Sequence, residues 1–160
     1  MKMFKSLMHI ALYTDNMDEM VRFYTEVLGA KIKVRTTYRS YLERDDRPEQ
    51  QRIARMDPDR IFNVYLELAE GQFIELFPKK EGQINDVGWG ERLGYHHYAL
   101  LVDDIYKARE ELSRKGLQFD TSISKGPSGT YQMWAHDPDG NKFEIMQFTA
   151  DSYQVTGHIE

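Results

Sequence analysis

The sequence predicts an α+β fold made of two tandem βαβββ modules. The first observation is a repeat: H-I-A-L-Y-T-D-N begins at His9, and the similar H-Y-A-L-L-V-D-D begins at His97. In both copies an alternating apolar segment leads into an Asp-rich helix start and a glycine-terminated helix. The second observation is that each copy ends in an apolar strand whose glutamate, Glu75 or Glu144, stands four residues after a turn glycine.

The first module shows one helical period among several strand patterns. Asp15 or Asn16 can cap a helix in which apolar residues recur at spacings of three and four, and Glu19 is placed to complete a capping box with Asn16. Gly29 ends this helix. The expected strands span residues 8–13, 31–37, 62–68 and 72–77.

The second module repeats this order with shorter connections. Asp103 or Asp104 caps its helix, and Gly116 ends it. The turn Asp137-Pro138-Asp139-Gly140 precedes the last strand. The strands expected after the helix span residues 117–124, 131–136 and 142–148.

Two regions break the symmetry of the repeat. Residues 39–60 are dense in both charge signs, with a short helix expected at 49–56 behind Asp46 and Pro48 near its first turn. Such an insertion is a solvated surface, a lid or a dimer contact, and the sequence leaves these open. The predicted organisation is a first module at 1–78, a Gly-rich linker with Trp89 at 79–94, a second module at 95–149 and a tail at 150–160.

Composition excludes several classes of function. The 160 residues are 41% hydrophobic, enough for a real core, and the net charge of −5 argues against nucleic acid or an anionic membrane as partner. The chain has no cysteine, so thiolate sites and disulfides are excluded, and a cytoplasmic location is expected. No apolar run approaches the ~20 residues of a membrane span.

The repeated histidine and glutamate point to a metal. Duplication of a fold needs to repeat only the hydrophobic positions, yet His9, Glu75, His97 and Glu144 all recur at matching places. Two histidines and two carboxylates bind a divalent ion and leave positions open for substrate. The repeat aligns His97, not the neighbouring His96, with His9, so His96 is expected to face away. His136 and His158 have no repeat counterpart, and a surface or rim position is expected for both.

These motifs resemble the vicinal oxygen chelate superfamily, which includes glyoxalase I. The resemblance rests on F-Y-T-E-V-L-G at Phe23–Gly29 and D-P-D-G-N-K-F-E at Asp137–Glu144, and it covers about residues 9–147. It implies that the two modules form a curled eight-stranded mixed sheet around a metal cup. It also implies metal ligation by His9, Glu75, His97 and Glu144.

The number of ligands separates the subfamilies that this chain resembles. Ring-cleaving dioxygenases and fosfomycin-resistance enzymes lack an acidic ligand in the first module, whereas glyoxalase I has the His, Glu, His, Glu order found here. The expected function is therefore a metal-dependent lyase or isomerase of the lactoylglutathione lyase type, acting through an enediolate. The alternatives are an epimerase, an extradiol-type dioxygenase and a non-catalytic protein that binds small ligands. Nickel, cobalt, zinc, manganese and iron all suit these ligands.

The resemblance also implies roles for the two glutamates, and the sequence departs from the family pattern at one position. It implies that Glu144 and Glu75 are the catalytic carboxylates, with Glu144 the stronger candidate for the base. Many glutathione-dependent relatives have an arginine four residues after the first histidine, but here that residue is Tyr13. The expected partner is a small-molecule substrate, which need not be a glutathione adduct. A homodimer is expected, because modules of this superfamily pair within one chain or across two.

Overall fold

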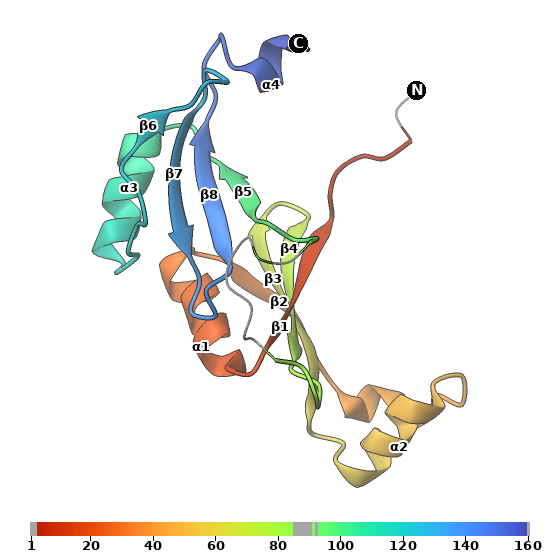
Figure 1. Ribbon diagram of the computed structural model, residues 1–160. Helices are drawn as coiled ribbons and strands as arrows, with labels where there is room; N and C mark the ends of the chain where they lie inside the picture. The colour runs from red at the N-terminus through yellow and green to blue at the C-terminus, as the bar shows by residue number, and fades with distance from the viewer. Residues whose placement is uncertain (1–2, 85–90, 92, 160) are drawn as a thin grey trace. The chain divides into compact units, whose positions relative to one another are not determined.

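The computed structural model describes residues 3–84, 91 and 93–159. The chain divides into two compact units, Met1–Gln83 and Ile84–Glu160, and each holds one four-stranded mixed sheet (Figure 1). The predicted Trp89 of the linker lies outside the described residues. The predicted module boundaries and the closure of both sheets into one cup stay predictions.

Unit 1 has the strand order β1-β4-β3-β2, in which β1 and β4 are parallel and the other neighbours are antiparallel. Buried Val64, Leu66, Ile74 and Leu76 form the core face of this sheet. Buried Met20 of α1 belongs to the same core, and α1 contacts β4. The elements are β1 His9–Thr14, α1 Met17–Arg22, β2 Lys31–Thr37, β3 Ile61–Ala69 and β4 Gln72–Pro78.

Unit 2 has the matching strand order β5-β8-β7-β6, again with one parallel pair, β5 and β8. Its core face holds buried Met133, Ala135, Phe143 and Ile145, and Ile105 of α3 is fully buried with them. The elements are β5 Tyr98–Leu101, α3 Ile105–Arg114, β6 Ser124–Lys125, β7 Tyr131–His136 and β8 Lys142–Gln147. The identical order in both units confirms the predicted tandem α+β modules.

The first helix is shorter than expected and its cap differs from the prediction. After Arg22 the backbone continues as a π-helical turn, η1 Phe23–Val27, and Gly29 then turns the chain at φ 77°. The capping box is wrong: the side chain of Asn16 caps nothing, and its backbone N–H donates to Thr14 Oγ1 at 2.9 Å. Thr14 Oγ1 therefore accepts the hydrogen bond from the backbone N–H of Asn16 that the Glu19 side chain was expected to accept.

The strand expected at 117–124 is largely wrong. Only β6 and an isolated bridge between Phe119 and Ala135 form there. One backbone bond joins the N–H of Asp120 to the Trp134 carbonyl at 2.8 Å, and side chains supply the next two bonds. Thr121 Oγ1 accepts from the backbone N–H of Trp134 at 3.0 Å, and Arg109 donates to the Thr121 carbonyl at 3.0 Å. The guanidinium of Arg109 also lies 4.6 Å from the centre of the Phe119 ring.

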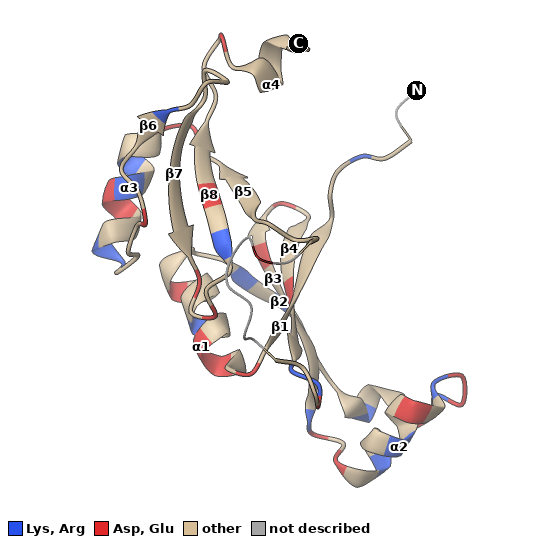
Figure 2. Cartoon of the chain, viewed as in Figure 1, with Lys and Arg blue, Asp and Glu red and all other residues tan. Residues whose placement is uncertain are grey.

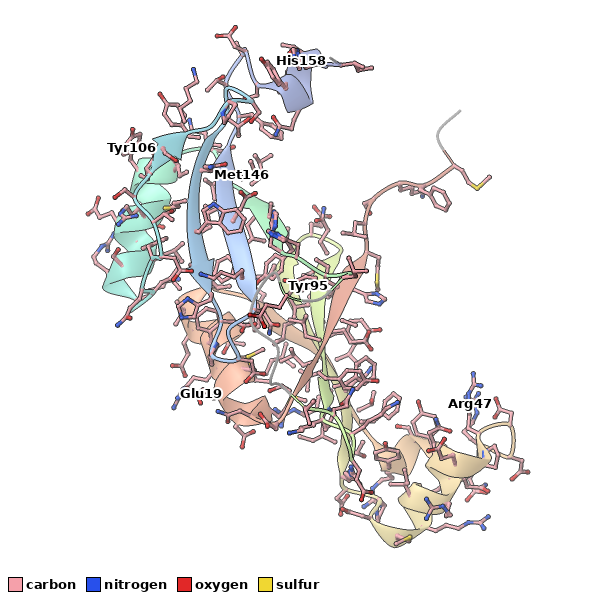
Figure 3. All side chains as sticks on the ribbon, in the orientation of Figure 1. Glu19, Arg47, Tyr95, Tyr106, Met146 and His158 are labelled. Carbon is pink, nitrogen blue, oxygen red and sulfur yellow. The ribbon has the colours of Figure 1, made fainter. Side chains whose placement is uncertain are left out.

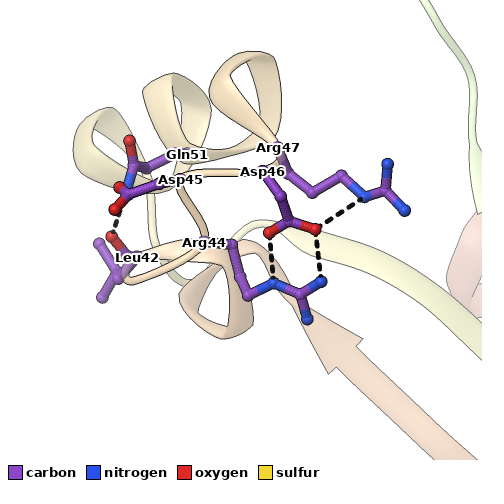
Figure 4. Close-up of polar contacts among 6 residues, drawn as sticks. All are labelled: Leu42, Arg44, Asp45, Asp46, Arg47 and Gln51. Carbon is purple, nitrogen blue, oxygen red and sulfur yellow. Dashed lines mark hydrogen bonds and ion pairs between the residues drawn. The ribbon is translucent and has the colours of Figure 1, made fainter.

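The charged insertion forms a small helical subdomain at one end of the first sheet (Figures 1 and 2). It consists of the 3₁₀ turn η2 Tyr38–Tyr41 and the helix α2 Pro48–Met56, which confirms the short helix with Pro48 in its first turn. Asp46 accepts two hydrogen bonds from Arg44, at 2.7 and 2.8 Å (Figure 4). Gln51 of α2 donates to the Leu42 carbonyl and to Asp45, both at 3.0 Å.

The tail that begins at residue 150 contains a four-residue helix, α4 Tyr153–Thr156, near His158 (Figure 3). Among the described residues, no helix combines the length and the apolar character that a bilayer span requires.

Candidate metal centre

The first His–Glu pair is assembled by the parallel strands β1 and β4. Ala11 is the register partner of Glu75, so His9, two residues earlier, lies on the same face of the sheet. His9 Nε2 lies 3.3 Å from Glu75 Oε2. Glu75 is only 5% exposed although its neighbours Ile74 and Leu76 belong to the core face. A buried carboxylate needs compensating partners, and His9 is one of them.

The second pair repeats this arrangement in unit 2. Ala99 is the register partner of Glu144, and His97 lies two residues before Ala99. His97 Nε2 lies 3.2 Å from Glu144 Oε2, and Glu144 is 8% exposed. The same atom types meet at nearly the same distance in both units. The structure therefore brings each predicted histidine to its predicted glutamate.

Glu75 has further support that the sequence did not reveal. Asn63 Nδ2 donates to Glu75 Oε1 at 2.6 Å, and Thr36 Oγ1 donates to Asn63 Oδ1 at 2.5 Å. Burial raises the pKa of Tyr65 to about 12, together with its hydrogen bond to Glu75, so the phenol stays a neutral donor. Tyr65 also packs edge-on against the His9 ring, with centroids 5.7 Å apart.

Glu144 has a different environment at the corresponding positions. Trp134 is its register partner, as Tyr65 is the partner of Glu75, and Trp134 packs edge-on against His97 at 4.7 Å. Gln132 replaces Asn63, but its amide lies beside Gly126 instead of reaching the carboxylate. Each histidine thus packs against an aromatic ring. Of the two glutamates, only Glu75 accepts a hydrogen bond from a side-chain amide of the described residues, that of Asn63, which we call the amide clamp.

The position of His96 differs from the one expected from the sequence. It was predicted to face away, but its Nδ1 lies 2.6 Å from Nδ1 of His97, and its ring is edge-on to Trp134 at 6.4 Å. The reason is that β5 begins at Tyr98, so both histidines precede the strand and strand alternation does not separate them. His97 is likewise just outside the strand that was expected to carry it.

The donors fit a borderline divalent metal. Each unit offers one imidazole nitrogen and one carboxylate oxygen that already converge on each other, and such donors suit zinc, nickel, cobalt, manganese and iron. Within the described ranges, no group of three or more His, Cys, Asp or Glu residues comes together as a metal site. Each unit therefore presents half of the predicted ligand set.

Sequence reasoning missed the residues that hold these ligands in place. Asn63 and Tyr65 had a readable signal, since they stand at alternate positions of a mostly apolar strand, twelve and ten residues before Glu75. Asp120, which binds both His136 and Lys142 in unit 2, had none, because the spacing of these three residues along the sequence has no pattern.

The chain is similar in sequence and fold to several known proteins. A lactoylglutathione lyase of Neisseria meningitidis is 29% identical over 142 residues, covering 88% of this chain and 89% of that protein. The protein YwbC of Bacillus subtilis is 29% identical, covering 91% of this chain and 99% of its own length. A crystal structure of a glyoxalase family protein from Enterococcus faecalis superposes with a TM-score of 0.67 at 23% identity, covering 91% and 99% of the two chains.

The family model for the Glyoxalase/Bleomycin resistance protein/Dioxygenase superfamily matches residues 6–145. This match spans both units and includes all four predicted ligands. The chain belongs to the Glyoxalase/Bleomycin resistance protein/Dioxygenase superfamily.

Proposed function

We propose that this protein is a metal-dependent lyase or isomerase of the lactoylglutathione lyase type. The observation that carries the proposal is the pair of equivalent contacts, His9 with Glu75 and His97 with Glu144, at 3.3 and 3.2 Å. A family member with two acidic donors differs from the dioxygenase pattern of two histidines and one glutamate. Similarity to the Neisseria lactoylglutathione lyase supports the same reading.

The proposed reaction moves a proton between adjacent carbons of a small substrate with two vicinal oxygens. A bound divalent ion supplies electrostatic stabilisation of the enediolate charge. The chain's own task is to hold a carboxylate beside the reacting carbon, where it takes the proton from one carbon and returns it to the other. Glu144 is the proposed base, because it lacks the amide clamp that fixes Glu75.

The proposal does not specify which thiol forms the substrate adduct. Tyr13 stands where glutathione-dependent relatives have an arginine, and the ammonium of Lys80 lies 5.6 Å from the centre of its ring. The proposed location is the cytoplasm, because a chain without cysteine has none of the disulfides that are common in secreted proteins. Assays therefore include the methylglyoxal adducts of glutathione and of smaller thiols.

Metal analysis tests the ligand assignment. We expect one divalent ion for each complete set of four ligands, and the double variant Glu75→Gln, Glu144→Gln loses most of it. Single variants refine the result: one shared ion predicts that either variant lowers the whole metal content, whereas one ion per unit predicts that each variant loses half. A double variant with full metal content contradicts the assignment.

Exchange of the substrate α-proton with deuterated solvent tests the reaction, run without oxygen. The wild type exchanges the proton, and Glu144→Gln lowers turnover by roughly 10²-fold because an amide is a very poor base. A binding protein shows no turnover in either form. Substrate consumption that depends strictly on O₂ rejects the isomerase and favours the dioxygenase.

A further inference from the structure

Unit 2 holds a second histidine-centred cluster that the four-ligand site does not use. His136, the last residue of β7, lies with its Nδ1 2.8 Å from Oδ1 of Asp120. The other oxygen of Asp120 lies 2.5 Å from Nζ of Lys142, the first residue of β8. His136 and Lys142 are register partners in the β7–β8 hairpin, whereas Asp120 comes from the segment before β6, so the fold brings its carboxylate to the hairpin.

This cluster lies on the same face of the sheet as Glu144. Along β7, Met133 and Ala135 point into the core, which leaves Trp134 and His136 on the opposite face. Register pairs Trp134 with Glu144 and His136 with Lys142. Two residues along a strand span about 6.6 Å, so His136 is one step beyond the Glu144 pair.

The row of side chains along β8 supports this placement. Lys142, Glu144 and Met146 alternate with the buried core residues Phe143 and Ile145, and Met146 is labelled in Figure 3. The hydroxyl of Tyr95, also labelled there, donates to the carbonyl of Lys142 at 3.1 Å and holds the start of the strand. A substrate group bound beside Glu144 therefore has His136 and Lys142 as neighbours in unit 2.

The hydrogen bonds orient the imidazole for proton transfer. A carboxylate only accepts hydrogen bonds, so Asp120 fixes the proton of neutral His136 on Nδ1 and leaves Nε2 as the basic atom. Burial alone would raise the pKa of Asp120, but hydrogen bonds from Lys142 and His136 outweigh it and hold that pKa below its ordinary value. Asp120 stays ionised and stabilises the imidazolium that forms when Nε2 takes a proton.

We propose that His136 is a second acid–base residue of the site, which carries a proton between the two vicinal oxygens of the substrate. Asp120 and Lys142 are its positioning residues. This inference rests on the proposed enediolate reaction and adds a proton path that the carboxylates do not supply. It predicts a substrate with a hydroxyl on one carbon and a carbonyl on the next.

The isomerisation of such a substrate requires two proton movements. Glu144 takes the proton from the hydroxyl-bearing carbon and delivers it to the former carbonyl carbon. The hydroxyl oxygen must lose its proton as it becomes a carbonyl, and the former carbonyl oxygen must gain one. His136 Nε2 accepts the first and returns it to the second, so atoms and charge balance without any oxidant or reductant.

Chemical rescue tests the role of His136, with the adducts of methylglyoxal with glutathione and with 2-mercaptoethanol as substrates. We expect His136→Ala to lower kcat by roughly 10²-fold at unchanged metal content, and added imidazole to restore at least a tenth of the lost rate. Asp120→Asn lowers kcat without responding to imidazole, because the histidine is still present. His158→Ala is the matched control, a histidine on the tail that stacks on Tyr153, and it leaves kcat unchanged.

A second measurement does not depend on activity. Nitrogen NMR of the metal-free protein is expected to show neutral His136 as the Nδ1–H tautomer, and Asp120→Asn to remove that preference. An Nε2–H tautomer in the wild type, or an active wild type with unchanged or unrescued His136→Ala, overturns the inference and leaves the proposed function standing. A wild type that exchanges no α-proton with either adduct overturns the proposed function and this inference with it.

Discussion

At the scale of single residues, the two glutamates of the repeat are not equivalent. Asn63 and Tyr65 bind the carboxylate of Glu75, whereas the counterpart positions of Glu144 hold Gln132 and Trp134, and Gln132 lies against Gly126. Partners of this kind hold a ligand in one orientation and commonly change metal affinity by 10–100-fold, as an order of magnitude. We therefore expect Glu75 to be the more rigid of the two proposed ligands, and Glu144 to be the one that can leave the metal and act as base.

Replacing Asn63 tests this difference. We expect Asn63→Ala to weaken metal binding by roughly tenfold, because Glu75 loses the donor that fixes its Oε1. Gln132→Ala is the matched control at the same position of the other repeat, and it leaves metal affinity within about twofold. Metal titration measures both, with thermal unfolding to verify the fold. Equal losses in the two variants would show that the amide clamp has no special role.

At the scale of elements, α3 begins with a cap that the sequence left undecided between two aspartates. Asp104 Oδ1 accepts from the backbone N–H groups of Tyr106 and Lys107, both at 3.0 Å. We expect Asp104→Ala to lower the free energy of unfolding by about 1 kcal/mol, the typical value of a lost N-cap. Asp103→Ala serves as control and costs little. Urea denaturation of both variants decides, and a larger loss for Asp103 contradicts the assignment.

The same scale shows what the sequence could predict. The pattern of residues 31–37 and 131–136 gave strands with the observed bounds, because the apolar side chains there alternate and pair with a neighbouring strand. The pattern of residues 117–124 failed, because Thr121 and Arg109 bind the backbone through their side chains. The repeat predicted which histidine meets which glutamate. The repeat did not reveal that Asn63 and Tyr65 bind Glu75, which depends on the register of β3 against β4. It also did not reveal that Asp120 binds His136, because Asp120 lies outside the strands.

The insertion offers a test of pH dependence. Hydrogen bonds from Arg44 lower the pKa of Asp46 to about 2, from an ordinary value of 3.8, despite the opposing effect of desolvation. Because the folded pKa is the lower one, the stabilisation is present above about pH 4 and is lost as the pH falls toward 2. The pair is solvent-exposed, so the effect is local to the loop before α2 (Figure 4).

Hydrogen exchange of α2 measures this effect. We expect Asp46→Asn to speed exchange at the start of α2 at pH 5, and the difference from wild type to vanish near pH 2. Glu43→Gln is the control, since the described residues provide Glu43 with no ion pair. A difference that persists at pH 2 would mean that Asp46 acts through something other than its charge.

At the scale of the whole molecule, the repeat consists of two four-stranded sheets, each with two edge strands. β1 and β2 are the edges of the first sheet, and β5 and β6 are those of the second. Edge strands with apolar side chains favour pairing with a further chain. On β2, Ile32 pairs with Leu66 and Val34 pairs with Tyr65. Leu66 and Tyr65 are consecutive in β3 and point to opposite faces, and Ile32 and Val34 are each more than 40% exposed. Apolar side chains on an edge strand favour contact with another apolar surface, because such a contact removes them from water.

We therefore expect the protein to form a homodimer through the β2 edge. Light scattering at micromolar concentration should give twice the chain mass of 18.9 kDa. Val34→Lys places a charge on the edge and should shift the protein toward monomer, because burying an unpaired ammonium opposes edge pairing. Ile159→Lys is the matched control, a fully exposed apolar residue on the tail, and it leaves the mass unchanged. A wild-type monomer contradicts the dimer, and a dimeric Val34→Lys places its interface elsewhere.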